Sequence, residues 1–238
     1  MSARQIRASY PDTRSWIRAI PGASATAPAT GLPMPGATGA AALPADPVAQ
    51  FLDWLEEAVV AGVVEPHVAT LSTVDEAGAP DARTLLLKDV TEAGWWFSSD
   101  RRSPKARQLD ADPVAALTFY WREQGRQVRV RGSVVRGDAD VSARDFLERS
   151  VTARAVAAAS RQSEILTDVA EYDAAVRESV AEVEADPSYV EDTWQAWCLV
   201  PETVEFWHAD PGRRHLRVRY RRSLEVEGVS WARDALWP

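Results

Sequence analysis

The side chains best suited to chemistry in this chain are cations spaced along segments with strand-like or helix-start sequences. Arg83 and Lys88 bracket the apolar run of "RTLLLK", and Lys105 falls in the first turn of a helix predicted to follow Ser103. The helix dipole disfavours a cation in the first turn unless an anion is also bound there. These positions therefore favour a site for an anion.

Two further segments carry polar groups of the same kind. In "RQVRVRG", Gln127, Arg129 and Arg131 share one face of a predicted strand, and the two valines take the other. The segment "SRQSE" at 160–164 offers an amide and hydroxyls at the predicted start of a helix. Phosphate groups are commonly held in such a place.

A basic run, "GRRHLRVRYRR", stands at residues 212–222. A strand period of two gives one of its faces Arg213, His215, Arg217, Arg219 and Arg221. Five such side chains repel one another unless solvent or an anion neutralises them. For any one of these arginines a solvated strand edge is the simpler interpretation. For the whole set, taken with the cations described above, an anionic ligand is favoured.

The composition limits what these cations can be for. The net charge is −8, and the isoelectric point is near 5.0. Nucleic acids and anionic membranes both select basic surfaces, so neither is expected as a partner. The single cysteine excludes an internal disulfide and favours a reducing compartment. With no long apolar run and no signal-peptide pattern, we expect a soluble, cytoplasmic protein.

Familiar catalytic motifs are absent from the sequence. There is no G-x-S-x-G elbow, no phosphate-binding P-loop and no G-x-G-x-x-G. One cysteine and three scattered histidines make a zinc site improbable, so no metal is expected. Cys198 lies in an apolar segment and is interpreted as a small core residue. Any chemistry would therefore need a cofactor.

The elements that must position these residues follow from the pattern along the chain. Residues 1–45 are rich in Ala, Pro and Gly and are predicted to form a flexible arm, and 46–238 the ordered domain. A helix is predicted from Asp46 and Pro47, with Val48, Phe51, Leu52, Leu55 and Val59 at helical spacing. Residues 140–185 have helical composition. Predicted strands cover 67–75, 81–90, 95–99, 114–121, 127–137 and 194–209, and continue in 212–222 and the C-terminal "SLEVEGVSWARDALWP". This order predicts an antiparallel barrel with helices inserted before its last strands.

The motifs "RTLLLK", "YWREQGRQVRVRG", "SRQSE", "VEFW" and "RRHLR", in this order, resemble those of the pyridoxamine 5′-phosphate oxidase-like flavoproteins. The resemblance runs from about Asp46 to Pro238. It implies a fold that is mainly β with helices (α+β), an FMN-binding split β-barrel. It also implies a homodimer that binds FMN at the subunit interface.

The same resemblance implies roles for individual residues. Arg83 and Lys105 would hold the FMN phosphate, and Gln127 would meet the flavin ring from the other subunit. The full set of expected FMN ligands is Arg83, Thr84, Leu85, Leu86, Leu87, Lys88, Ser98, Ser99, Lys105, Gln127, Gln162, Ser163, Trp207 and Arg217.

The expected substrate site departs from the family's vitamin B6 oxidases. Lys88, Arg149, Arg213 and His215 match the residues that hold the B6 substrate there, and Arg213 and His215 are the expected catalytic pair. Asp145 stands in place of a tyrosine, and Ala153 in place of a serine. An aspartate repels a substrate phosphate, and an alanine removes a hydrogen-bond donor. The chain also ends in "ALWP" rather than the B6-type "RLAP".

These departures give three hypotheses. The favoured one is an FMN-dependent oxidase, similar to the phenazine-pathway branch, that oxidises a small aromatic anionic substrate with O₂ as acceptor. The alternative enzyme is a pyridoxine/pyridoxamine 5′-phosphate oxidase with an altered phosphate cup. The third is a flavin- or B6-binding protein without catalytic activity. Nucleic-acid binding by the arginine run is disfavoured by the net charge.

Overall fold

The computed structural model describes residues 43–225 and 228–238. Most of the predicted arm, 1–45, therefore lies outside the described residues. Its last described residues are held by the sheet. The carbonyl of Leu43 accepts a hydrogen bond from Arg233 at 2.6 Å, and the carbonyl of Pro44 accepts one from the Tyr220 hydroxyl at 3.0 Å.

Two helices begin where their capping residues predict. Helix α3 (Pro47–Val60) follows Asp46, whose carboxylate accepts the Val48 N–H at 3.0 Å. Helix α4 (Pro104–Ala111) follows Ser103, whose hydroxyl accepts the Ala106 N–H at 3.4 Å. In both helices proline occupies the first position, where its missing N–H carries no penalty.

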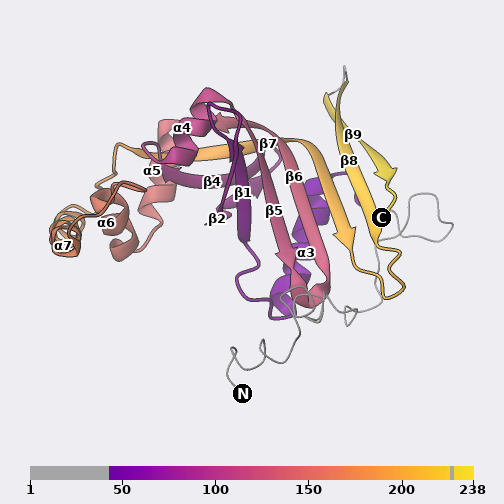
Figure 1. Cartoon of the computed structure of the whole chain (residues 1–238), viewed down its shortest axis with the longest axis horizontal. Coiled ribbons are helices and arrows are strands. Elements are labelled where there is room, and N and C mark those ends of the chain that lie inside the picture. Colours follow the sequence, from indigo (N-terminus) through magenta and orange to yellow (C-terminus); the bar gives the residue numbers. More distant parts are fainter. Residues whose placement is uncertain (1–42, 226–227) are drawn as a thin grey trace, which may run out of the picture.

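The strands form one antiparallel sheet of nine strands in the order β2-β1-β5-β6-β7-β4-β3, with β8 on β7 and β9 on β8 (Figure 1). The predicted antiparallel architecture is confirmed, but the single strand predicted over 81–90 is wrong. It is divided at Leu87 and Lys88. There the Leu87 N–H donates to the His67 carbonyl, and the Lys88 N–H donates to the Trp96 carbonyl. The strands are β1 (Val68–Val74), β2 (Pro80–Leu86), β3 (Asp89–Thr91), β4 (Gly94–Asp100), β5 (Val114–Trp121), β6 (Arg126–Arg136), β7 (Trp194–His208), β8 (Leu216–Glu225) and β9 (Gly228–Ala235).

Strand β7 is long enough to belong to two parts of the sheet. Its first half pairs with β4 and its second half with β8, while β6 runs beside it through both. The pairing of β6 with β7 shifts register at Gly132. A Cβ at Gly132 would lie 2.0 Å from the Val200 carbonyl oxygen, so glycine is required at this close approach. The irregularity lets the sheet curl into a half-barrel.

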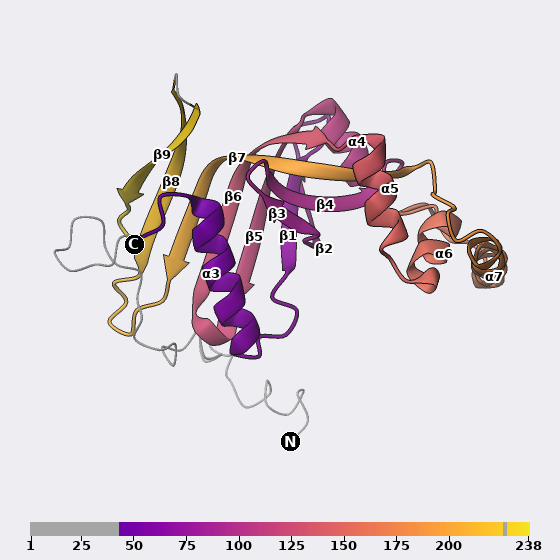
Figure 2. The ribbon, with the colours of Figure 1, turned by 180° about the vertical axis from the view of Figure 1, so that it is seen from behind.

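Helix α3 covers one face of the curled sheet (Figure 2). Phe51 and Trp54 carry this contact: the Phe51 ring lies 4.9 Å from Phe119, and the Trp54 ring 5.2 Å from Phe206. The predicted apolar stripe of α3 is therefore only partly correct. Leu52 and Val59 are exposed, and Trp54 and Ala58 are buried in their place, because the stripe that begins at Phe51 continues three and seven residues later.

Three further helices lie together at one end of the molecule: α5 (Ala139–Leu147), α6 (Val151–Ala159) and α7 (Val169–Ala185). The prediction that "SRQSE" starts a helix is wrong, because the segment follows the end of α6. Ser160 is the C-cap residue, and Ser163 has a positive φ of 72°. The next helix starts only after Asp168, whose side chain caps α7. No helix in the described part of the chain is long and apolar enough to cross a membrane.

Candidate active site

A pocket of about 270 Å³ lies where β2 and β4 meet α4, α6 and the loop after α6. It is open to solvent on one side, and its lining is polar near α4. Seven of the expected site residues line it: Thr84, Leu85, Ser98, Ser99, Lys105, Arg149 and Gln162. The structure thus gathers residues from four regions of the sequence into one pocket.

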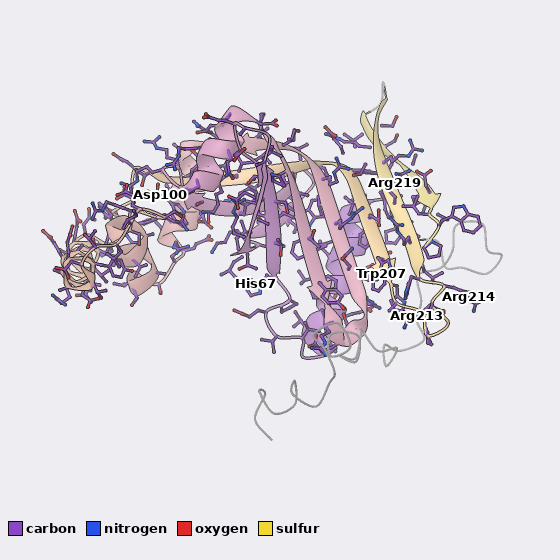
Figure 3. All side chains as sticks on the ribbon, in the orientation of Figure 1. His67, Asp100, Trp207, Arg213, Arg214 and Arg219 are labelled. Carbon is purple, nitrogen blue, oxygen red and sulfur yellow. The ribbon has the colours of Figure 1, made fainter. Side chains whose placement is uncertain are left out.

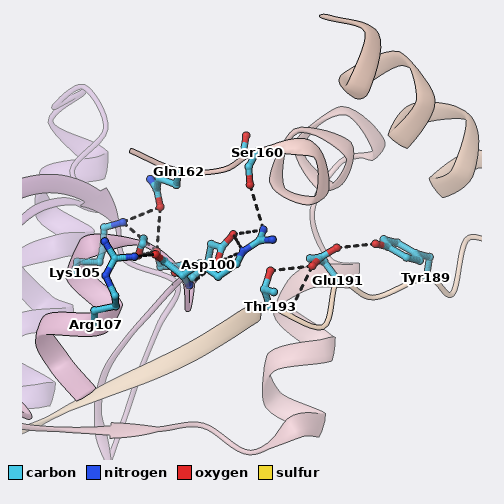
Figure 4. Close-up of polar contacts among 11 residues, drawn as sticks. Asp100, Lys105, Arg107, Ser160, Gln162, Tyr189, Glu191 and Thr193 are labelled. Atoms are coloured by element: carbon cyan, nitrogen blue, oxygen red, sulfur yellow. Dashed lines mark hydrogen bonds and ion pairs between the residues drawn. The ribbon is translucent and has the colours of Figure 1, made fainter. Parts of the chain in front are cut away.

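Lys105 is the cation at the centre of this pocket. Only 9% of the residue is exposed, and its ammonium donates to the Ser99 hydroxyl at 3.1 Å and to the Gln162 side-chain oxygen at 2.9 Å (Figure 4). Both acceptors are neutral, and within the described residues Lys105 forms no ion pair. Burial, reinforced by the charge of Arg83, lowers the pKa of Lys105 from 10.5 to about 8.

The other charged groups near Lys105 are already engaged. Arg83 forms an ion pair with Asp81 and donates to Thr73 at 2.5 Å and to Gln108 at 3.0 Å. The Asp100 carboxylate accepts hydrogen bonds from the Arg102 backbone N–H at 2.6 Å and from its guanidinium, the shortest at 2.6 Å. The carboxylates closest to the pocket therefore bind arginines, and Lys105 keeps an uncompensated charge.

Two more polar groups in the pocket lack partners within the described residues. They are the Ser98 hydroxyl and the Nε of Arg149, and both atoms are buried. The Arg149 guanidinium lies 4.4 Å above the Trp194 ring, and burial lowers its pKa. Together with Lys105, these donors suit an anion with several acceptor oxygens.

A second group of expected residues forms a row across the outer sheet face. Gln127 on β6 lies opposite Trp207 on β7, which lies opposite Arg217 on β8. Their neighbours Val128, Phe206 and Val218 are fully buried on the α3 side. Because side chains alternate along a strand, the row points away from α3. The predicted face of Gln127, Arg129 and Arg131 is confirmed by the same alternation.

Arg217 and His215 are both fixed by neighbours in this row. Arg217 donates to Glu205 at 3.0 and 2.8 Å and to the Trp237 carbonyl at 2.9 Å. The His215 ring lies 4.9 Å from the Trp207 ring, and its Nδ1 accepts the Asp210 N–H at 3.2 Å. The indole of Trp207 and the imidazole of His215 thus form one aromatic surface.

The prediction that Arg213 shares a strand face with His215 and Arg217 is wrong. Strand β8 begins only at Leu216, and Arg213 lies in the preceding turn with a positive φ of 64°. Its N–H donates to the Asp210 carbonyl at 3.0 Å, and its side chain is exposed. The turn at "DPGRR" interrupts the strand period, so Arg213 is free to extend toward solvent.

Arg219 and Arg221, interpreted as a solvated strand end, are 38% and 50% exposed in their side chains, and both also have a carboxylate partner. Asp234, on the neighbouring strand β9, accepts hydrogen bonds from Arg219 at 3.1 Å and from Arg221 at 2.5 Å. These hydrogen bonds lower the pKa of Asp234 to about 2, with that from Arg221 the larger cause. The two arginines therefore share one carboxylate partner within the chain.

Lys88 lies apart from Lys105, in a separate cleft of about 260 Å³. Three carboxylates, those of Asp89, Asp145 and Glu148, share the lining of this cleft with the two cations of Lys88 and Arg144. Asp145 accepts the Trp194 indole N–H at 2.7 Å. Acidic side chains thus outnumber basic ones around Lys88.

The remaining expected ligands are spread around the first pocket. Leu86 is exposed and Leu87 is buried, so the apolar run of "RTLLLK" is only partly buried. Strand β2 is at the edge of the sheet, and alternate residues along it are exposed. Ser163 is exposed on the loop after α6 and does not line the pocket.

In one chain, the pocket at Lys105 and the row at Trp207 are far apart. Figure 3 shows Asp100, at the pocket, on one side of the sheet, and Trp207 and Arg213 toward the opposite end. The sequence suggested a single anion site, whereas in a single chain the expected site residues form two separate groups, one in the Lys105 pocket and one in the row at Trp207.

Several residues of the site were not predicted from the sequence. Thr73, Asp81 and Gln108 hold Arg83, and Trp194 supports Arg149. Helical spacing was a usable signal for Gln108, which lies three residues after Lys105 and therefore near the same helix face. No comparable signal pointed to Trp194, whose role depends on how β7 passes the end of α5.

Comparison with known proteins identifies the family. Residues 55–181 match the family model described as pyridoxamine 5′-phosphate oxidase. Residues 194–238 match the pyridoxine 5′-phosphate oxidase C-terminal dimerisation region. This chain belongs to the pyridoxamine 5′-phosphate oxidase family. The resemblance noted in the sequence motifs is confirmed, and so is the fold that it implied.

Curated members of the oxidase family align over most of the chain. A pyridoxine/pyridoxamine 5′-phosphate oxidase of Haemophilus influenzae (strain 86-028NP) is 38% identical over 195 residues, 81% of this chain and 90% of that protein. One from Thermosynechococcus vestitus is 41% identical over 196 residues, 81% of this chain and 89% of that protein.

Solved structures of the oxidase family share the fold. PhzG from Burkholderia lata 383, crystallised in complex with tetrahydrophenazine-1-carboxylic acid, superposes with a TM-score of 0.77 at 30% identity over 82% of this chain and 94% of that one. An FMN-binding protein from Nostoc punctiforme, related to pyridoxamine 5′-phosphate oxidase, gives a TM-score of 0.63 at 20% identity over 78% of this chain and 96% of that one. The second likeness supports the fold alone.

Proposed function

We propose that this protein is an FMN-dependent oxidase whose substrate is a reduced aromatic or heterocyclic carboxylate of the phenazine type. The observation that carries the proposal is Lys105, a buried ammonium that has only neutral partners within the described residues. A buried charge without a counter-ion is costly. A phosphate group bound in the pocket would supply that counter-ion.

The residues of the pocket fit the phosphate of FMN. Lys105 and Gln162 would hold its oxygens, with Ser99 and the unpartnered Ser98 hydroxyl beside them. Hydrogen bonds from a charged donor to a phosphate are among the strongest in proteins. Arg83 would add a second positive charge nearby, although Asp81 already offsets part of it.

The ring of FMN would be contacted by Gln127, Trp207 and Arg217 of a second copy. Within one chain Trp207 lies far from Asp100, which lines the same pocket as Lys105, so a single copy cannot complete the site (Figure 3). The match of residues 194–238 to a dimerisation region supports assembly as a homodimer. That region contains Trp207, Arg213, His215 and Arg217, so the proposed interface and the proposed ring site coincide.

When bound, FMN supplies a two-electron acceptor that O₂ reoxidises to give H₂O₂. The chain's own part is to orient the substrate. Nδ1 of His215 accepts a hydrogen bond from the Asp210 N–H. In a neutral imidazole the proton therefore lies on Nε2, which can donate it to a carboxylate. The Trp207 ring beside it restrains the imidazole. Arg213, exposed in its turn, would provide the charge that pairs with the carboxylate.

The acidic lining around Lys88 favours a carboxylate substrate over a phosphate ester. Asp145, Asp89 and Glu148 would repel a dianionic phosphate more strongly than a singly charged carboxylate. Ala153 offers no side-chain donor, and its carbonyl accepts from Arg149 at 3.4 Å. The likeness to PhzG in complex with tetrahydrophenazine-1-carboxylic acid supports the same substrate class.

The second candidate is a pyridoxine/pyridoxamine 5′-phosphate oxidase of vitamin B6 metabolism. Two observations favour it. The curated relatives at 38–41% identity bear that name. Lys88, Arg149, Arg213 and His215 are also retained at the positions that bind the B6 substrate in the family's B6 oxidases. On this hypothesis Asp145 and Ala153 weaken the phosphate cup without abolishing it.

Oxygen uptake by the FMN-loaded protein separates the candidates. We expect consumption with tetrahydrophenazine-1-carboxylic acid at ordinary enzymatic rates, and at least about tenfold slower turnover of pyridoxine and pyridoxamine 5′-phosphates. The reverse ranking would establish the B6 activity instead. Bound FMN without turnover of any of these compounds would favour a binding protein.

The proposed substrate contacts have their own test. Replacing Arg213 by alanine is expected to raise KM on the order of tenfold, since one ion pair to the carboxylate is lost. The flavin spectrum should stay unchanged, because Arg213 lies outside the residues proposed to hold FMN. Loss of flavin from Arg213→Ala would contradict this division between substrate and cofactor residues.

A further inference from the structure

The C-terminal segment forms a groove with the start of β8. The groove has a volume of about 410 Å³, and its walls come from Leu216 and Arg217 on one side and from Leu236, Trp237 and Pro238 on the other. His215 is also part of its lining. This groove therefore adjoins two residues of the proposed site without being the phosphate pocket.

Trp237 is the unusual residue in this groove. In the single chain this residue is 91% exposed, the highest value among the large hydrophobic residues in the described part of the chain. An indole buries a large apolar area when it finds a partner, so leaving one in water forgoes a substantial stabilisation. The indole shares this groove with Leu216, Leu236 and Pro238, and a contiguous exposed apolar surface commonly marks a binding site.

The backbone that carries this indole is fixed rather than loose. The Trp237 carbonyl accepts a hydrogen bond from the Arg217 guanidinium at 2.9 Å, and the Leu236 N–H donates to the Arg217 carbonyl at 3.0 Å. Arg217 is itself held by Glu205 at 2.8 Å. The exposed ring is thus presented from an anchored segment, which limits the entropy lost when a ligand packs on it.

The position of the groove defines what it can contact. His215 belongs both to the groove and to the aromatic surface with Trp207, whose ring centre is 4.9 Å away. A flat ligand held at His215 by a carboxylate would have the indole of Trp237 within the same groove. Offset or edge-on contact between aromatic rings adds to the stabilisation that comes from the buried area.

We propose that Trp237 is a specificity-determining residue that packs against the ring system of an aromatic carboxylate bound at His215 and Arg213. The inference rests on the proposed function, since it takes the carboxylate substrate from there. It adds that ring size is selected at the C-terminal segment: a tricyclic system reaches the indole, whereas a single ring held by the same carboxylate does not.

The test uses the FMN-loaded, full-length protein and two non-reacting probes. Binding of phenazine-1-carboxylate and of benzoate is followed through the flavin absorption spectrum for the wild type, Trp237→Ala and Trp237→Phe. We expect Trp237→Ala to weaken phenazine-1-carboxylate on the order of 10-fold and benzoate less than about 2-fold. Trp237→Phe should lie between the wild type and Trp237→Ala. Val229→Ala, a half-exposed apolar position on β9, is the matched control and should change neither affinity.

Each other outcome has a definite meaning. Equal binding of phenazine-1-carboxylate by the wild type and Trp237→Ala overturns the role of Trp237 and leaves the proposed function intact. No binding of phenazine-1-carboxylate by the FMN-loaded wild type overturns both. If sedimentation shows that Trp237→Ala and Trp237→Phe dissociate into single chains, the indole contacts a second copy, and the proposed role in specificity is wrong.

Discussion

The β8 segment and the pocket beside α4 both gather cations, but they differ in how those charges are balanced. On β8, Arg217 pairs with Glu205, and Arg219 and Arg221 share Asp234. Among the described residues, the partners of Lys105 in the pocket are neutral, a hydroxyl and an amide. Three arginines of β8 therefore have a carboxylate partner, whereas the buried Lys105 has none within the described residues.

This difference shows that charge balance, rather than the number of cations, locates an anion site. An exposed arginine beside a carboxylate is stable without a ligand, and such pairs contribute little energy. A buried ammonium with neutral partners is held in a less stable state until an anion arrives. The pKa of Lys105 reflects the cost of its buried charge, because burial lowers that pKa to about 8.

The strongest test removes the unbalanced cation. Lys105→Ala is expected to weaken FMN binding to the flavin-free protein by about 10- to 100-fold, because a hydrogen bond from a charged donor is lost. Riboflavin has the same ring without the phosphate, so its affinity should stay within about 2-fold. Titrations followed by flavin fluorescence measure both values.

A matched control for Lys105→Ala is available on the same helix. Arg107 is exposed on α4, so Arg107→Ala removes a positive charge at the surface and should leave FMN affinity nearly unchanged. Equal losses of FMN and riboflavin affinity in Lys105→Ala would mean that Lys105 supports the fold of the pocket rather than the phosphate. The proposed difference between the pocket and β8 in their need for an anion would then be wrong.

The pH dependence of FMN affinity tests the same difference between the unpaired Lys105 and the paired arginines of β8. In the flavin-free protein the pKa of Lys105 is about 8, so the ammonium loses its proton above that pH. A phosphate dianion favours the protonated form, and binding therefore takes up a proton. FMN affinity should fall as pH rises above about 8, by at most about tenfold per pH unit. This slope should disappear in Lys105→Ala, whereas a slope that persists there would assign the proton to another group.

The fold was largely predictable from the sequence because its signals are local. Asp46 and Ser103 cap their helices as their sequences indicate, and strand β5 was predicted at its observed bounds, 114–121. Failures occurred where distant contacts decide. Which residues of α3 are buried depends on the position of Phe206 across the sheet, and the end of α6 places "SRQSE" in a loop.

Sequence motifs named residues that the structure brings together, but not the ion pairs among the charged ones. The family motifs named Lys105 and Gln162, 57 residues apart, and the structure brings them within 2.9 Å. The sequence did not reveal which arginines pair with a carboxylate, because Glu205 and Asp234 contact their partners across strands. Cross-strand pairing depends on register, which a single sequence specifies weakly.

The reverse experiment removes a carboxylate from the balanced region. Glu205 is buried and accepts hydrogen bonds from Arg129 at 2.9 Å and from Arg217 at 2.8 Å. Glu205→Gln leaves both arginines without their counter-ion, and the free energy of unfolding is expected to fall by about 1–2 kcal/mol. Urea unfolding of the flavin-free protein at fixed concentration measures the change.

Glu205→Gln should also acquire a property that the wild-type β8 segment lacks. Its unbalanced arginines resemble Lys105 in needing an anion, so inorganic phosphate should stabilise this variant more than the wild type. To separate this effect from binding at the pocket, the same comparison is made in the Lys105→Ala background. An equal effect of phosphate on both proteins would show that the β8 arginines were not balanced by Glu205.

The smallest effect is expected for Asp234→Asn, which removes the partner of Arg219 and Arg221. Both arginines can turn to water, so the loss of stability should be smaller than for Glu205→Gln, and FMN affinity should not change. The pKa of Asp234 is lowered from 3.8 to about 2, mainly by its hydrogen bond from Arg221 and then by that from Arg219. Its pairing therefore stabilises the fold above about pH 4 and is lost as pH falls toward 2. Acid unfolding curves of the wild type and Asp234→Asn should converge over that range, and a difference that persists at pH 2 would assign the stabilisation to packing rather than charge.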